Sequence, residues 1–134
     1  MPGPRFFTDR SLGDHLLPET LRAAGWIVVS MRERYGSVTA QALVDIDWIR
    51  DATAEGEVLL TGDKAIAKRP LEARAVVASG ARVFALGKNQ LTGAQKAQRF
   101  LNLEAAIFRR AGRQPGPYVV SVNERGLETL KLFD

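Results

Sequence analysis

The sequence predicts an α/β protein with a mostly parallel sheet and a β-hairpin near its carboxyl end. Short apolar segments typical of strands alternate with helix-like segments along most of the chain. Residues 58–60 are apolar at every position, which is typical of a strand buried on both faces of a parallel sheet. Residues 118–122 and 127–132 are instead separated only by a short turn, as in a hairpin. Alternation of this kind favours parallel strands joined by right-handed crossovers.

Ahead of the hairpin, four strands are expected at residues 6–8, 26–29, 58–60 and 82–86. The segment 31–44 has no regular apolar period, and we expect it to be irregular.

The expected helices begin and end at residues suited to those positions. The first helix ends at Gly25, as a C-terminal glycine allows. A second helix is expected to be capped by Asp45, whose carboxylate can accept from free backbone donors, and to end at Gly56. A third begins with Pro70 and ends before Gly80.

The longest helix is expected to begin at the capping box Thr92-Gly93-Ala94-Gln95 and to reach about Ala111. Its apolar residues mark one face that packs in the core. Basic residues form a separate stripe, which is either a solvated face or a surface for nucleic acid. This stripe contains Lys96, Arg99, Arg110 and Arg113.

Length and composition narrow the class of protein. The 134 residues are enough for one domain with a real core, so we expect a single domain over residues 1–134. The chain has no cysteine and one histidine, His15, which excludes disulfides, thiolate metal sites and multi-histidine sites. No apolar run approaches the roughly 20 residues of a membrane span. We therefore expect a cytoplasmic protein that does not enter a membrane.

The charge is divided unevenly along the chain. Residues 1–63 carry six Lys or Arg against ten Asp or Glu, whereas residues 64–134 carry thirteen against five. A basic half could attract a phosphate backbone without regard to its sequence. Many small proteins are mildly basic and bind no nucleic acid, so the charge alone leaves both interpretations open.

Three aspartates follow or precede regular elements. Asp9 ends the first apolar run, Asp63 ends the run at 58–62, and Asp45 begins a helix. The carboxyl ends of parallel strands converge at one edge of the sheet, so these carboxylates can share one divalent metal ion. Taken singly, each aspartate also suits a turn or a helix cap.

Four stretches of the chain resemble PIN-like domains, and more narrowly the VapC-type toxin branch of that superfamily. They are Phe6–Gly13, Leu21–Val28, Asp45–Ile49 and Val58–Ile66. Each motif is short, but their order and spacing along the chain are fairly specific.

The resemblance implies a Mg²⁺- or Mn²⁺-dependent endoribonuclease on a three-layer α/β/α sandwich. Such proteins are commonly toxins that a cognate antitoxin neutralises, and a homodimer is plausible for the family. By position, Asp9, Asp45 and Asp63 would be the catalytic, metal-binding acids. Many PIN nucleases carry a fourth acid near the end of the next strand, where residues 85–89 here have none; either Asp47 substitutes for it or the site has only three acids.

Basic residues near these acids are candidates for binding RNA. Arg10 and Lys64 each adjoin a proposed ligand and either hold a phosphate or merely balance the acids. Lys96 and Arg99 would contact the RNA backbone from the long helix.

For three further side chains, a structural role is the favoured interpretation. Ser11 is expected to cap the first helix, Trp48 to lie in the core rather than stack on a base, and Thr61 to support Asp63 by a local hydrogen bond.

Two other functions compete with this one. A phosphoacceptor receiver domain also has an aspartate at a strand end, but it needs paired acids after the first strand and a lysine after the last parallel strand. Here Arg10 follows Asp9, and the strand at 118–122 ends at Asn123. A PIN-like domain without catalysis, which binds nucleic acid or protein, is the other alternative.

Overall fold

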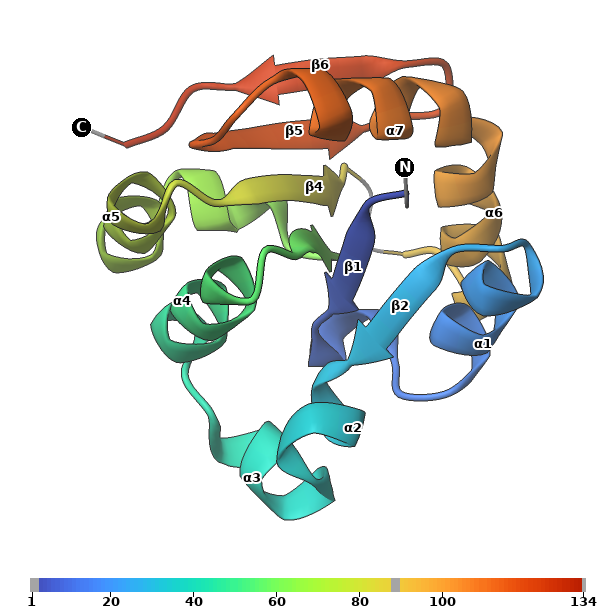
Figure 1. The fold of residues 1–134 in the computed structure, drawn as a ribbon, viewed down its shortest axis with the longest axis horizontal. Coiled ribbons are helices and arrows are strands. Elements are labelled where there is room, and N and C mark those ends of the chain that lie inside the picture. Colours follow the sequence, from blue (N-terminus) through green and yellow to red (C-terminus); the bar gives the residue numbers. More distant parts are fainter. Residues whose placement is uncertain (1–2, 88–89, 134) are drawn as a thin grey trace.

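A computed structural model describes residues 3–87 and 90–133. It contains a six-stranded sheet in the order β2-β1-β3-β4-β5-β6 (Figure 1). The first five strands pair in parallel and β6 pairs antiparallel with β5, so the expected α/β class and carboxyl-terminal hairpin are confirmed. The strands are β1 (Arg5–Thr8), β2 (Ile27–Ser30), β3 (Val58–Thr61), β4 (Arg82–Leu86), β5 (Tyr118–Val122) and β6 (Leu127–Leu130).

Seven α-helices and two short 3₁₀ helices are present in the described residues. They are η1 (Arg10–Leu12), α1 (Leu16–Ala23), α2 (Met31–Tyr35), α3 (Ser37–Ala42), α4 (Asp45–Ala54), η2 (Lys64–Ala67), α5 (Pro70–Ser79), α6 (Gly93–Asn102) and α7 (Glu104–Arg113). The segment 31–44, expected to be irregular, mostly forms α2 and α3. In Figure 1 these two helices project beyond the end of β2. No described helix is long and apolar enough to cross a bilayer.

The expected single long helix is wrong, because it is two helices that meet at Leu103. Leu103 has φ −115° and ψ 21°, outside the α-helical range, and it joins α6 to α7. Phe100 and Ile107 are nevertheless both buried in the same core cluster. The bend lets α6 pack beside α1 while α7 reaches Tyr118 of β5. The apolar spacing continues across the bend, so it carries no sign of the break.

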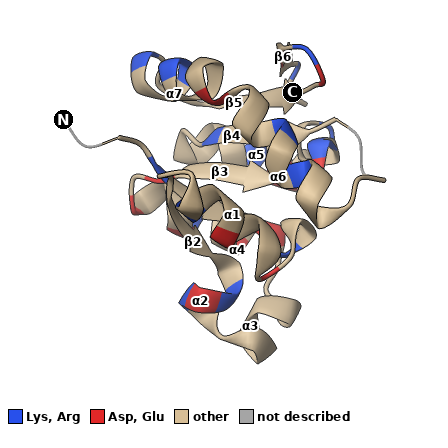
Figure 2. Cartoon of the chain, turned by 90° about the vertical axis from the view of Figure 1, so that its right-hand side faces the viewer, with Lys and Arg blue, Asp and Glu red and all other residues tan. Residues whose placement is uncertain are grey.

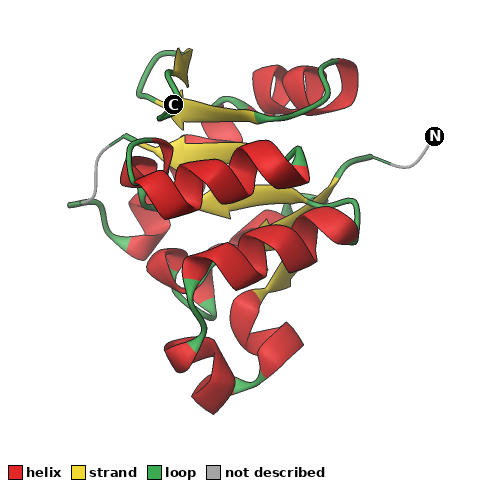
Figure 3. Ribbon diagram, turned by 90° about the vertical axis from the view of Figure 1, so that its left-hand side faces the viewer, coloured by secondary structure: helices red, strands yellow, loops and turns green. Residues whose placement is uncertain are grey.

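The sheet has a core on each face, because its side chains alternate along every strand. Phe6 points into a cluster with α1, α6 and α7, and its neighbour Phe7 points into a cluster with α4 and α5. Leu59 and Leu60 divide between the two clusters in the same way. Helices therefore cover both faces of the sheet, and the expected three-layer arrangement is confirmed (Figure 3).

The chain order makes a topological switch point between β1 and β3. The helix after β1 is α1, which packs on one face, and the helix after β3 is α5, which packs on the other. In open α/β sheets, the connections diverge at such a switch point and leave a crevice outside the carboxyl ends of the strands. Asp9 and Asp63 follow these two strands directly or after one residue. The fold thus carries both aspartates to the usual ligand position of this architecture.

The start of α6 is fixed by the capping box that the sequence predicts. The backbone N–H of Gln95 donates to Thr92 Oγ1 at 3.1 Å, and the N–H of Thr92 donates to Gln95 Oε1 at 2.9 Å. Replacing Thr92 with alanine is expected to lower the free energy of unfolding by about 1 kcal/mol. Urea denaturation measures this change. The control Gln98→Ala, at an exposed position of the same helix, should cost less than about 0.5 kcal/mol, and an equal loss in both variants would contradict the capping role.

Candidate active site

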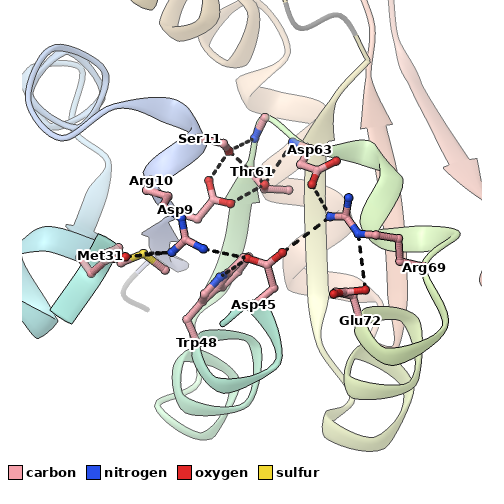
Figure 4. Close-up of polar contacts among 12 residues, drawn as sticks. Asp9, Arg10, Ser11, Met31, Asp45, Trp48, Thr61, Asp63, Arg69 and Glu72 are labelled. Carbon is pink, nitrogen blue, oxygen red and sulfur yellow. Dashed lines mark hydrogen bonds and ion pairs between the residues drawn. The ribbon is translucent and has the colours of Figure 1, made fainter. Parts of the chain in front are cut away.

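Asp9 lies at the switch point and is nearly inaccessible to solvent. Its backbone N–H donates to the carbonyl of Leu60 at 3.2 Å, so the chain leaving β1 still pairs with β3. The residue is 5% exposed. Ser11 Oγ donates to one carboxylate oxygen, and Thr61 Oγ1 donates to the other at 2.7 Å (Figure 4).

The pKa of the Asp9 carboxyl is raised from 3.8 to about 6, chiefly because burial penalises the charged form. The negative charge of Asp45 raises it further, whereas the hydrogen bonds from Ser11 and Thr61 act in the opposite direction. The two hydroxyl groups therefore hold the carboxylate in place without fully compensating its charge.

Asp45 is the first residue of α4, and Val44 occupies the N-cap position. The expectation that its side chain caps the helix is wrong, because no backbone donor of α4 reaches it. The carboxylate instead accepts a hydrogen bond from Trp48 Nε1 at 2.9 Å, since residues three apart lie on one helix face. Trp48 is fully buried and stacks on Phe7, as expected for a core residue. The buried indole thus holds Asp45 in place, where its carboxylate faces Arg10 and Arg69.

Asp63 is held at the amino end of η2. Its Oδ1 accepts from the backbone N–H of Ala65 at 3.0 Å. Its own N–H donates to Thr61 Oγ1 at 3.1 Å, which confirms the expected local support by that threonine. The same Thr61 hydroxyl bonds Asp9, so one side chain joins the two aspartates.

Arg69 completes the arrangement, although the sequence interpretation did not single it out. Its Nη2 contacts Asp63 Oδ2 and lies 3.6 Å from Asp45 Oδ2, while its Nε lies 3.4 Å from Glu72. Figure 4 shows the guanidinium between these carboxylates. Its position in the sequence could have indicated this role, because Arg69 directly precedes Pro70, where the segment that follows β3 enters α5.

The cluster holds more carboxylates than guanidinium groups. Four carboxylates face two guanidinium groups, those of Arg10 and Arg69. As the side chains stand, no three Asp, Glu or His side chains in the described part of the chain are arranged to hold a metal ion. The donor chemistry nevertheless fits a hard divalent cation, which prefers carboxylate oxygens and is attracted by uncompensated negative charge.

Comparison with known proteins identifies the family to which this arrangement belongs. The family model described as "PIN like domain" matches residues 4–88, which include β1, β3, α4 and all three aspartates. The chain belongs to the PIN-like domain family. It is also 38% identical over 117 residues to a Mycobacterium tuberculosis protein named "Putative ribonuclease VapC45", covering 87% of this chain and 84% of that protein. No solved structure matches.

Two of the expected RNA-binding residues of this PIN-like domain lie against the aspartate site. Arg10 Nη1 donates to the carbonyl of Ala40 at 2.8 Å, and its Nη2 lies 3.7 Å from Asp45. It therefore connects α3 to the aspartates. Lys96 Nζ donates to the carbonyl of Ser11 at 3.1 Å, which brings the basic face of α6 to the same edge (Figure 2).

The other candidates are less closely associated with the site. Lys64 is exposed at the start of η2, and Arg99 is half-buried one turn after Lys96. Asp47 pairs with Arg50 at 3.5 Å within α4, and no described hydrogen bond or ion pair joins it to the three aspartates.

Ser11 does not cap the first helix of the PIN-like domain. His15 occupies the N-cap position of α1, and Ser11 lies in η1, where its hydroxyl bonds Asp9 and accepts from the N–H of Gly62 at 2.8 Å. A Cβ at Gly62 would lie 3.2 Å from that hydroxyl, closer than ordinary packing. The glycine therefore allows the loop after β3 to approach η1. His15 itself lies beside Arg32 on the surface.

Proposed function

We propose that this PIN-like domain is a Mg²⁺- or Mn²⁺-dependent endoribonuclease that acts in the cytoplasm as the toxin of a toxin–antitoxin pair. The observation that carries the proposal is that Asp9, Asp45 and Asp63 come together at the switch point, where one threonine joins Asp9 to Asp63 and one arginine joins Asp45 to Asp63. The name of the mycobacterial relative, a ribonuclease, agrees with it.

Asp9, Asp45 and Asp63 would hold the divalent ion. When bound, such an ion supplies a Lewis acid that polarises a phosphoryl oxygen and makes water nucleophilic at neutral pH. The remaining residues serve as supports. Thr61 and Ser11 fix the orientation of Asp9 through its two carboxylate oxygens, and Trp48 fixes Asp45. A site held this firmly needs little reorganisation during the reaction.

The basic residues around the site would attract the RNA backbone. Lys96 and Arg10 lie at the aspartate edge, Lys64 directly follows Asp63 in the chain, and Arg99 lies one turn after Lys96 on α6. Contacts of this kind recognise phosphates rather than bases, so they position RNA without specifying its sequence.

Lys96→Gln is expected to raise the KM for RNA several-fold while leaving kcat nearly unchanged, because the lysine binds backbone phosphate away from the bond that is cleaved. The slope of log affinity against log salt concentration should fall by about 1. Steady-state cleavage kinetics measure KM and kcat, and fluorescence titration of labelled RNA over a range of salt measures the slope. Lys131 is exposed, and Lys131→Gln is the control. An unchanged salt slope in the Lys96 variant would show that Lys96 does not contact the RNA backbone.

Cleavage assays with purified protein test the reaction itself. With Mg²⁺ or Mn²⁺, the protein should cut structured or unstructured RNA, and Asp63→Asn should abolish the cut. Asp14→Asn, at an exposed carboxylate near the amino terminus, is the matched control. Intact RNA after incubation with the wild-type protein and either metal would reject the proposal.

The toxin role needs a separate test in cells. Expression of the wild-type chain should arrest growth, Asp9→Asn should not, and the product of a neighbouring gene should restore growth by covering the acidic edge. Co-purification would identify that antitoxin, and light scattering would test the homodimer that we also propose. Unimpaired growth during strong expression of the soluble wild-type chain would argue against a toxin.

A non-catalytic PIN-like domain is the second candidate. It is favoured by the absence, in the described residues, of a ready-made group of metal ligands, and by the lack of an acid at residues 85–87. It predicts RNA or protein binding without any metal dependence. The receiver-like alternative has no such support, because the chain belongs to a different family.

A further inference from the structure

The guanidinium of Arg69 lies where a cation shared by Asp45 and Asp63 would be expected. Its Nη2 contacts both carboxylates, and Glu72 holds its Nε at 3.4 Å. Each of these acids raises the pKa of Arg69, with the hydrogen bond to Asp63 as the largest effect, so the ion pairs stabilise its charged form. Arginine remains charged at every physiological pH.

Arg69 also accounts for a disagreement within the site. Three aspartates from different elements meet at one edge, yet the described side chains offer no ready-made group of metal ligands. Two of the three carboxylates, those of Asp45 and Asp63, are turned toward the guanidinium (Figure 4). A divalent ion bound to both would meet a positive charge within a few ångströms, and like charges repel.

The contacts of Arg69 allow it to leave without unfolding the site. Its side chain is 42% exposed, and Arg69 lies in the loop before α5 rather than within a helix. The other supports of the two aspartates, Trp48 Nε1 and the Ala65 N–H, do not depend on it. Ion pairs at this exposure contribute little individually, so a bound divalent ion can replace them.

We propose that Arg69 is the resident counter-cation of the metal-free site and competes with the divalent ion for Asp45 and Asp63. This inference rests on the proposed metal-dependent function. It makes Arg69 a positioning residue that keeps the two carboxylates together before the ion binds and sets the metal concentration at which the site fills.

Calorimetric titration with Mn²⁺ alone tests the inference without relying on activity. Arg69→Gln should bind Mn²⁺ roughly 3- to 30-fold more tightly than the wild type, because two or three weak ion pairs no longer have to be broken. Arg69→Lys should fall between them, since one ammonium cannot span both carboxylates as the fork of arginine does. Arg74→Gln, at an exposed position of α5, is the matched control and should bind as the wild type does.

The outcomes separate this inference from the function on which it rests. Equal or weaker Mn²⁺ binding by Arg69→Gln, with normal binding by the wild type, would overturn the competition while leaving the nuclease proposal intact. If neither the wild type nor any variant binds Mn²⁺, the proposed metal site itself is rejected. If Arg69→Gln fails to fold without metal, Arg69→Lys gives the decision, because affinity equal to or lower than wild type in that variant also overturns the proposal.

Discussion

Replacing Asp9 with asparagine is expected to abolish RNA cleavage and to make the metal-free protein more stable. Asp9 is 5% exposed, and burial raises the pKa of its carboxyl to about 6, so keeping it charged at neutral pH costs folding free energy. Asparagine has nearly the same shape, and its amide oxygen can still accept from one of the two hydroxyl groups of Ser11 and Thr61, while its amide NH2 can only donate toward the other. The loss of a metal ligand should reduce cleavage by more than the roughly 10- to 100-fold that losses around the ligands cost.

The pH dependence of stability gives this prediction a definite sign. The native carboxyl holds its proton up to about pH 6, whereas the ordinary value is 3.8, so the folded state binds more protons in this interval. Stability from this group is therefore present below pH 4 and is lost as pH rises to about 6. A shift of this size corresponds to about 3 kcal/mol at most. In Asp9→Asn that decline should disappear.

Urea denaturation of the metal-free wild type and Asp9→Asn between pH 4 and pH 8 measures this difference. The stability gain of the variant should grow with pH and level off above about pH 6. A variant that is less stable than the wild type at pH 8 would show that the hydrogen bonds of the charged carboxylate outweigh its burial.

Trp48→Ala is expected to produce the largest loss of stability among the substitutions considered, about 3–5 kcal/mol. The indole is fully buried, stacks on Phe7 with ring centroids 5.6 Å apart, and fills the core beneath the site. Thermal or urea unfolding measures the loss. A cost below about 1 kcal/mol would mean that the core collapses around the missing ring.

Trp48→Phe separates the packing role of this residue from its support of Asp45. The ring remains in the core, but the hydrogen bond from Nε1 to Asp45 Oδ1, 2.9 Å long, is lost. A hydrogen bond to a charged group contributes about 1.5–3 kcal/mol. We expect a protein that folds, with cleavage and Mn²⁺ affinity both reduced because Asp45 is no longer fixed. Wild-type Mn²⁺ affinity in this variant would show that the indole has no part in positioning Asp45.

The sequence predicts the sheet better than the helices, for a physical reason. Strands buried on both faces must be apolar throughout, so segments such as 58–60 are visible in the sequence. The bend at Leu103 is set instead by how α6 and α7 reach different parts of the sheet. Tertiary packing of this kind leaves the apolar spacing unchanged. The segment 31–44 was missed because α2 and α3 are too short to show a period.

In the site, the chain itself indicates which elements deliver Asp9, Asp45 and Asp63, because strand ends and helix starts are local features. The hydrogen-bond and ion-pair partners of these aspartates, however, are not all close to them in sequence. The hydroxyl of Ser11 was expected to cap a helix, yet it bonds a carboxylate two residues earlier and the backbone of Gly62, fifty-one residues later. Arg69 is likewise defined by contacts with residues that the fold brings together. Contacts of this kind can be identified only from the folded structure.

Binding of Mn²⁺ to the wild type and to three single variants is the most direct test of the central claim. Asp9→Asn, Asp45→Asn and Asp63→Asn should each lose most of the saturable binding seen by calorimetry in the wild type, while Asp14→Asn keeps it. Binding that is absent from the wild type, or that survives unchanged in all three variants, would contradict a shared metal site at the switch point between β1 and β3.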